Sequence, residues 1–276
     1  HACIIDGVRL HQGKRYVFKH NDIENLKKQL ERATKLATEQ DGAILVITEG
    51  VFGMSGNQGK LKEIVELKKQ YNFRLFVDDA HGIGTMGKTG AGTGEAQGVQ
   101  DDIDVYFGTF AKSFASIGAF IAGDEDMVRY LRYNMRSQIF AKSIPMPLVV
   151  GARKRLKMIK TMPELKDQLW VIANALQKGL VKAGFNIGTT NTQVTPVILE
   201  GGLGEATNLT LDLRENHGLF CSIVVYPVIP RGMIILRLIP TAMHTLEDVE
   251  YTIETFKKVH KKLLASEYKS DEIAAV

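Results

Sequence analysis

The chain has 276 residues, of which 45% are hydrophobic and 24% charged, the balance of an ordinary soluble protein with one large or two modest domains. Its net charge of +4 is too small to argue for nucleic acid binding, although it suits anionic small molecules. No apolar run is long enough to span a bilayer. The two cysteines, Cys3 and Cys221, form no disulfide framework or CxxC motif, which favours a reducing, cytoplasmic setting.

Helical and strand patterns alternate through the first half of the chain. Apolar residues recur every three to four positions over 22–40, which predicts an amphipathic helix. The wholly apolar run 43–47 is typical of a buried parallel strand. The pattern continues with helices over 60–71 and 124–140 and strands over 74–79, 104–110 and 118–123. This order predicts an α/β fold with a mostly parallel sheet sandwiched by helices.

The sequence changes character after residue 147. The segment 148–184 is largely helical with a break near Pro163, and further strands and a helix follow at 195–199, 222–226, 233–239 and 246–264. We therefore predict a large domain over 1–147 and a smaller C-terminal α+β domain, with its linking helix, over 148–276. The first residues read like the interior of an α/β domain, so we also expect the N-terminal part of the large domain to be missing.

One segment has the sequence pattern of a nucleotide-binding motif but not the sequence context that such a motif needs. The segment 82–89 matches the P-loop pattern GxxxxGK[ST]. A true P-loop leads directly into a helix whose N-terminus holds the phosphates. Here Gly90, Gly92 and Gly94 follow at once, which makes an immediate helix unfavourable. We therefore do not expect nucleotide hydrolysis.

Two expected strand ends carry the groups that a pyridine cofactor bound as a Schiff base requires. One strand ends in Asp78 and Asp79, with His81 close behind, and Lys112 follows Thr109 at the end of the next. A lysine forms the imine, an aspartate keeps the ring nitrogen protonated, and hydroxyl and imidazole groups hold the other ring edges. Each residue alone could serve a solvated turn or the surface, but the combination favours a cofactor site. The histidines and cysteines lack the spacing of metal ligands, so no metal is expected.

Arg237 lies inside the hydrophobic segment 234–239, where an unpaired guanidinium would be costly. A carboxylate partner is therefore expected. It is either an internal aspartate or glutamate or the α-carboxylate of a substrate, and the sequence does not decide between them.

Four separated segments resemble the α-oxoamine synthases, which are pyridoxal-phosphate enzymes of the aminotransferase-like fold type I. Residues 77–93 match the family pattern VD[DE]xHxxGxxGxxGxG, and 104–118 match its lysine strand and loop. Residues 236–244 match LRLxxTAxH, and 1–7 match an NHAS-like start. The resemblance runs from residue 1 to about residue 264. It implies pyridoxal 5'-phosphate as the cofactor.

The resemblance also implies roles for individual residues. Lys112 would bind the cofactor covalently and then move protons at the substrate's α-carbon, and His81 would contact the phenolic oxygen of the ring. These two residues would be catalytic. Asp78 would pair with the pyridine nitrogen, and His1 would stack on the ring face.

Further contacts follow from the same resemblance. Thr109 would reach the cofactor phosphate, Ser143 would serve the phosphate of a neighbouring subunit, and Arg237 would bind the carboxylate of the amino acid. Relatives commonly carry a serine at the position of Gly53, and two small hydroxyl residues where this chain has Ala141 and Lys142.

Family members condense an amino acid with an acyl-CoA and release the carboxylate as CO2. Segments 48–54 and 137–143 are most similar to bacterial serine palmitoyltransferases. The resemblance thus implies a homodimer, with its active site at the interface, that condenses L-serine with palmitoyl-CoA to 3-ketodihydrosphingosine, a step of sphingolipid biosynthesis. Such lipidic partners are compatible with transient membrane contact. The alternatives are a sister synthase that uses glycine or alanine with another acyl-CoA, and a non-catalytic partner subunit, against which Lys112 argues.

Overall fold

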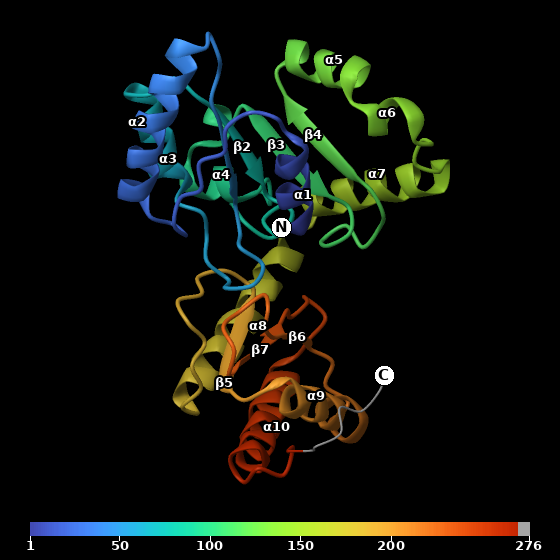
Figure 1. Cartoon of the computed structure of the whole chain (residues 1–276). Coiled ribbons are helices and arrows are strands. Elements are labelled where there is room, and N and C mark those ends of the chain that lie inside the picture. The colour runs from blue at the N-terminus through green and yellow to red at the C-terminus, as the bar shows by residue number, and fades with distance from the viewer. Residues whose placement is uncertain (270–276) are drawn as a thin grey trace.

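Two separate β-sheets organise the computed structural model, which describes residues 1–269. Figure 1 shows them in two lobes joined by a helical segment. The large lobe holds a four-stranded sheet in the order β1-β2-β3-β4, and the small lobe holds a three-stranded sheet in the order β5-β7-β6. Among residues 1–269, no helix combines the length and the apolar character that crossing a membrane requires.

The large lobe is an α/β layer structure. Its strands are β1 (Leu45–Glu49), β2 (Arg74–Asp78), β3 (Val105–Thr109) and β4 (Ala119–Gly123). Its helices are α1 (Ala2–Leu10), α2 (Ile23–Glu39), α3 (Leu61–Glu66), α4 (Thr93–Gln97), α5 (Glu125–Asn134), α6 (Arg136–Phe140) and α7 (Met146–Thr161), with 3-10 turns η1 (Leu67–Lys69) and η2 (Gln100–Asp102). β1, β2 and β3 run parallel and β4 is antiparallel to β3. The predicted α/β fold with a mostly parallel sheet is confirmed.

The core of the large lobe explains this arrangement. α2 and α3 turn their apolar faces, including Leu30 and Ile64, onto Leu75 and Val77 of the central strand β2. Both β2 side chains are fully buried, and they lie on the same face of the sheet because they are two positions apart. Because the three parallel strands stay in register, their carboxyl ends meet at one edge of the sheet.

The small lobe packs three helices with its antiparallel sheet. Its elements are α8 (Pro163–Lys182), β5 (Thr195–Glu200), α9 (Leu203–His217), β6 (Ser222–Val224), β7 (Met233–Leu238) and α10 (Leu246–Leu264). One hydrophobic core takes side chains from every helix and from β7, including Leu180, Leu209, Leu236 and Phe256. The predicted domain boundary between residues 147 and 148 stays a prediction. It assigns α7 to the small domain as its linking helix.

Most predicted elements appear within a few residues of their expected bounds, and the differences have physical causes. The first strand lies at 45–49 rather than 43–47. The helix predicted over 124–140 is two helices, because Met135 has an extended backbone between them. α9 has no predicted counterpart, since only a narrow face, with Ala206, Leu209 and Leu213, is apolar and buried.

Adjacent leucines near the end of α10 provide a matched test of this packing. The exposed fraction is 7% for Leu263, which lies in the small-lobe core, and 73% for Leu264. We expect Leu263→Ala to lower the free energy of unfolding by about 2–4 kcal/mol, because it leaves a cavity. Leu264→Ala should change it by less than about 0.5 kcal/mol. Urea denaturation followed by circular dichroism measures both, and equal midpoints would contradict the observed packing.

Candidate active site

Asp78 ends β2 at the edge where the parallel strands meet. Its register neighbours are Glu49 at the end of β1 and Phe107 in β3. The carboxylate is buried, and its Oδ1 accepts a hydrogen bond from the Ala80 amide at 3.0 Å. No other hydrogen bond reaches this carboxylate within residues 1–269. One oxygen of a buried acid is therefore available for an N–H donor of a ligand.

The neighbouring Asp79 serves the protein itself. Its fully buried carboxylate accepts hydrogen bonds from the amide and the hydroxyl of Thr93, both at 2.7 Å, and from the Tyr106 hydroxyl at 3.0 Å. Gly92 approaches so closely, with φ at 121°, that any side chain there would overlap the carboxylate. Burial raises the pKa of Asp79. Asp79 thus anchors the glycine-rich loop (residues 82–92), and Asp78 remains for chemistry.

The glycine-rich loop is not a P-loop. It forms turns, and the first helix after it, α4, begins only at Thr93, five residues beyond Lys88. α4 is a helix of five residues. The prediction against nucleotide hydrolysis agrees with this local structure, since no helix N-terminus directly follows the GKT segment.

His81 stands at the start of this loop with its ring against Gly53. A side-chain carbon at position 53 would overlap the Nε2 atom of His81. Burial, together with the positive charges of Lys112 and Arg237, lowers the pKa of His81 to about 3. The imidazole is therefore neutral near pH 7, and it offers one N–H donor and one acceptor.

Lys112 lies in the lysine loop (residues 110–118) that follows β3. Phe114 is 2% exposed and contacts Phe110 edge-on at 5.2 Å between ring centroids, so the loop has an apolar anchor. The Ser113 hydroxyl donates to the Ile83 carbonyl at 2.7 Å, which ties this loop to the glycine-rich loop. These contacts fix the backbone on both sides of the lysine.

The surroundings of Lys112 favour its neutral, nucleophilic form. Although the residue is exposed, partial burial lowers the pKa of its ammonium, and the carboxylates of Asp78 and Glu49 oppose this shift. Asp78 and Lys112 therefore act on each other electrostatically at one edge of the sheet. A lowered lysine pKa raises the fraction of free amine that can attack an aldehyde.

Arg237 reaches this edge from β7 of the small lobe. Its Nη1 donates to the Gly53 carbonyl at 3.0 Å and its Nη2 to the Ser222 hydroxyl at 3.5 Å. Its Nε is buried without a partner, and within residues 1–269 no carboxylate lies within ion-pair distance. The alternative of an internal acidic partner is thus wrong for the described part of the chain. Burial lowers the pKa of Arg237, as expected for a guanidinium without a counterion.

The other predicted residues differ in how close they come to this group. His1 caps α1, accepts from the Cys3 amide at 3.3 Å, and its amino group contacts Glu49 at the end of β1. The Thr109 hydroxyl donates to the Gly118 carbonyl and accepts from the Ala111 amide, both at 3.1 Å. Thr109 therefore shapes the lysine loop, and its contact with a phosphate stays a prediction.

Ser143 lies apart from the other predicted residues. It is exposed in the connection between α6 and α7, and its side chain makes no hydrogen bond to residues 1–269. Its role at a neighbouring subunit's phosphate also stays a prediction.

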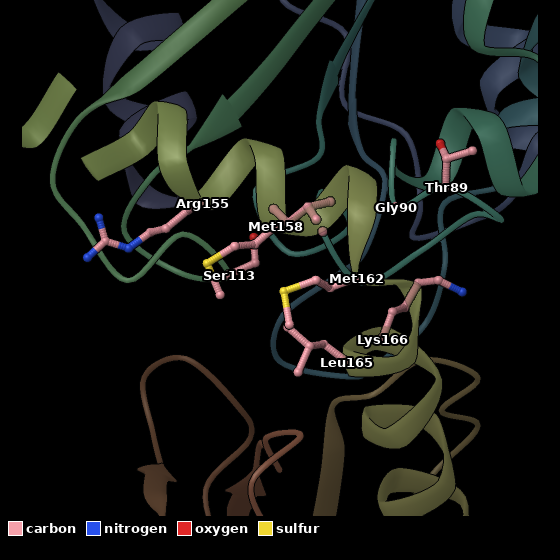
Figure 2. Close-up of a pocket in the computed structure, with 10 residues that line it drawn as sticks. Thr89, Gly90, Ser113, Arg155, Met158, Met162, Leu165 and Lys166 are labelled. Atoms are coloured by element: carbon pink, nitrogen blue, oxygen red, sulfur yellow. The ribbon is translucent and has the colours of Figure 1, made fainter. Parts of the chain in front are cut away.

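A small cavity lies beside the lysine loop. Figure 2 shows Met158, Met162 and Leu165 around it, with Ser113 on one side and Lys166 near the opening. Its volume is about 110 Å³. Ligand pockets usually measure several hundred Å³. The cavity is therefore too small to hold a cofactor.

The chemistry of the assembled groups fits pyridoxal phosphate. The free oxygen of Asp78 can accept from a pyridinium N–H, the amine of Lys112 can bind an aldehyde, and the neutral His81 can donate to a ring oxygen. Arg237 offers an uncompensated cation for a carboxylate. These groups come from β2, the two loops and β7, so the site depends on both lobes. Sequence reasoning did not find the Asp79 anchor or the Gly53 contact, because both depend on packing between distant segments.

Comparisons with known proteins agree with this chemistry. Residues 1–256 match the family model described as aminotransferase class I and II. Over 270 residues the chain is 63% identical to the cysteate-C-fatty acyltransferase of Capnocytophaga ochracea, covering 98% of this chain and 64% of that protein. It is 37% identical to the 8-amino-7-oxononanoate synthase of Fervidobacterium nodosum, covering 95% of this chain and 65% of that protein. The chain thus spans less than two thirds of the length of either relative.

A solved structure supports the fold. The model superposes on a serine palmitoyltransferase from S. paucimobilis with bound PLP at a TM-score of 0.88 and 31% identity. The match covers 96% of this chain and 65% of the other. The predicted aminotransferase-like fold type I and pyridoxal phosphate as its cofactor are confirmed, and the roles of the individual site residues stay predictions.

The positive charge of Arg237 near His81 predicts that replacing this arginine changes the pKa of His81. In Arg237→Gln we expect the pKa of His81 to rise above about 3, because one of the charges that disfavour imidazolium is removed. NMR titration of the imidazole carbon-bound protons measures this directly. The control is Arg231→Gln, since Arg231 is exposed and stacks on the Tyr226 ring at 4.6 Å instead. An unchanged His81 pKa in Arg237→Gln would contradict the proximity of the two groups.

Proposed function

Since the chain belongs to the aminotransferase class I and II family and, within it, to the α-oxoamine synthases, we propose that it joins an amino acid to a fatty acyl group with release of CO2. Its cofactor is pyridoxal phosphate, as the family and the PLP-bound serine palmitoyltransferase structure indicate. The observation that best supports the proposal is that Asp78 ends β2 beside β3, and that the loop after His81 is bonded to the loop that carries Lys112 through Ser113 and Ile83.

Each residue has a distinct part in the proposed reaction. Pyridoxal phosphate supplies an electron sink for the α-carbon of the amino acid. Lys112 would hold the cofactor and would take and return a proton at the α-carbon of the amino acid. Asp78 keeps the ring nitrogen protonated through its free oxygen. His81 donates its single N–H to the ring oxygen, and Arg237 binds the α-carboxylate until it leaves.

Cysteate is the amino acid that we propose first. The relative with 63% identity is a cysteate-C-fatty acyltransferase. The electrostatics of the site also favour an anionic substrate, since Arg237 and Lys112 each lower the pKa of His81 and Arg237 lacks a counterion within residues 1–269. A sulfonate adds a second negative charge to the substrate, which such a site stabilises.

L-serine with palmitoyl-CoA, the prediction from the sequence, is the second candidate. It is favoured by the resemblance of segments 48–54 and 137–143 and by the TM-score of 0.88 to a serine palmitoyltransferase. In that case the reaction would belong to sphingolipid biosynthesis. A sister synthase using glycine or alanine is a third candidate, consistent with the 37% identity to an 8-amino-7-oxononanoate synthase.

We also propose a homodimer with shared active sites. Large apolar side chains are exposed on the segment from α5 to α7, namely Tyr130, Tyr133, Phe140, Met146 and Val150. Contiguous exposed apolar surface of this kind marks interaction sites. Ser143 lies in the same segment, as a residue that serves a second subunit's phosphate would. The cytoplasmic setting remains part of the proposal and rests on the two free cysteines.

Lysine replacement tests the cofactor chemistry. We expect Lys112→Ala to abolish the visible absorbance of the lysine-bound cofactor, because no other described group replaces the amine. The control is Lys88→Ala, an exposed lysine of the glycine-rich loop, which should keep the absorbance. If folded Lys112→Ala keeps the absorbance band, Lys112 does not bind the cofactor and the proposed site is wrong. The proposed site is also wrong if the unsubstituted protein shows no band. A band that Lys112→Ala abolishes would also argue against the non-catalytic partner subunit.

Substrate competition tests the choice of amino acid. We expect kcat/KM for cysteate with palmitoyl-CoA to exceed that for L-serine by about tenfold or more, which corresponds to about 1.4 kcal/mol of differential binding. Release of CO2 and CoA measures turnover across cysteate, serine, glycine and alanine, each with palmitoyl-CoA and acetyl-CoA. A preference for serine would select the second candidate. A preference for glycine with acetyl-CoA would reject fatty acyl transfer.

A further inference from the structure

The segment 189–194 of the small lobe is bonded to the large lobe along its whole length. Asn57 donates from Nδ2 to the Thr189 carbonyl at 2.6 Å. The hydroxyls of Thr190 and Thr192 both donate to the Gly56 carbonyl, at 3.1 Å and 2.9 Å. These bonds join residues more than 130 positions apart and hold the segment against the loop that carries Gly53.

Gln193 lies in this segment and contacts the backbone of His81. The residue is 4% exposed, and its Nε2 donates to the His81 carbonyl at 2.8 Å. Rotating the amide by half a turn would set its oxygen against that carbonyl oxygen, so the donor end must face His81. The other end, Oε1, is buried and has no partner within residues 1–269.

The His81 backbone is the point at which the ring can be oriented. Its side chain makes no hydrogen bond to residues 1–269, so the ring depends on its contact with Gly53 and on its own peptide group. The Thr85 hydroxyl also donates to the His81 carbonyl, at 2.8 Å, and Trp170 of α8 donates to the Thr85 carbonyl at 2.9 Å. The small lobe therefore donates a hydrogen bond to each end of the turn 81–85, from Gln193 and from Trp170.

The unpaired oxygen distinguishes this contact from ordinary stabilisation. A buried acceptor without a partner weakens the folded state. The His81 carbonyl would keep its bond from Thr85 if Gln193 were apolar. Stability alone would thus favour an apolar side chain of the same size at position 193, and the amide needs another explanation.

We propose that Gln193 is a positioning residue that holds the His81 ring, from the small lobe, in the orientation in which it meets the cofactor's ring oxygen. The inference rests on the proposed function, because Gln193 acts through the proposed contact of His81 with that ring oxygen. Gln193 itself does not touch the reacting atoms.

Gln193→Met tests this inference, because methionine keeps the length of the side chain and removes the donor. We expect kcat to fall severalfold while KM for the amino acid stays unchanged, since substrate binding is left to Arg237. The pH midpoint of the visible absorbance of the lysine-bound cofactor should rise by about half a unit, because a weaker hydrogen bond to the ring oxygen disfavours the more negatively charged, deprotonated form. The thermal midpoint should be equal or higher.

The matched control is Gln177→Met. Gln177 is a half-buried glutamine of the small lobe, and its Nε2 donates to the Thr192 carbonyl at 2.8 Å and to the Thr195 hydroxyl at 3.0 Å, without a bond to His81. It should leave kcat and the absorbance midpoint unchanged. Gln193→Glu places a carboxylate against the His81 carbonyl and should shift the midpoint further than methionine, which keeps the test decisive if one variant folds poorly.

A readout without cofactor separates this inference from the proposed function. In the cofactor-free protein, NMR should show changed His81 imidazole shifts in Gln193→Met and unchanged shifts in Gln177→Met. Unchanged shifts, absorbance midpoint and kcat in both Gln193 variants would overturn the inference. If the unsubstituted protein bound no cofactor at Lys112, the proposed function would fail. Altered His81 shifts without a change in kcat or in the absorbance midpoint would show that Gln193 is only a structural contact, which also overturns the inference.

Discussion

The buried carboxylate of Asp79 is the contact on which the active edge depends. It binds Thr93, directly after the glycine-rich loop, and Tyr106 in β3, so one side chain joins the end of β2 to the neighbouring strand and to the loop. Because Asp79 is saturated with donors, the adjacent Asp78 keeps an oxygen for a ligand. The two neighbouring carboxylates thus differ in role, because they lie on different faces of the strand end. Asp79 holds the loop in place, and Asp78 has an oxygen that a ligand can reach.

The second determinant is the partial burial of His81, Lys112 and Arg237. Burial and mutual repulsion keep His81 neutral, and burial lowers the pKa of both Lys112 and Arg237. The same cause would suit each group to its proposed part: the lysine as a nucleophile, the imidazole as a neutral donor, and the guanidinium as a site for an anion. The large lobe supplies the first two groups and the small lobe the third, so the proposed site depends on the contact between the lobes.

Local patterns carried most of what the sequence could predict. Asp78, His81 and Lys112 follow apolar runs directly, so their place at strand ends could be inferred from periodicity, and the resemblance gave them roles. The split at Met135 could not, because neither glycine nor proline marks it. Contacts such as Gln193 with His81 or Gly53 with the same ring join residues far apart in the chain, and spacing contains no record of them.

The close approach of Gly53 to the His81 ring limits which segments this protein can exchange with its relatives. The family resemblance implies a serine at that position in relatives, yet here any substituent on the α-carbon would occupy the space of the imidazole. A chimaera that imports a relative's 48–54 loop would displace the ring unless the partner segment moved with it. The two regions must therefore evolve, or be engineered, as a linked pair.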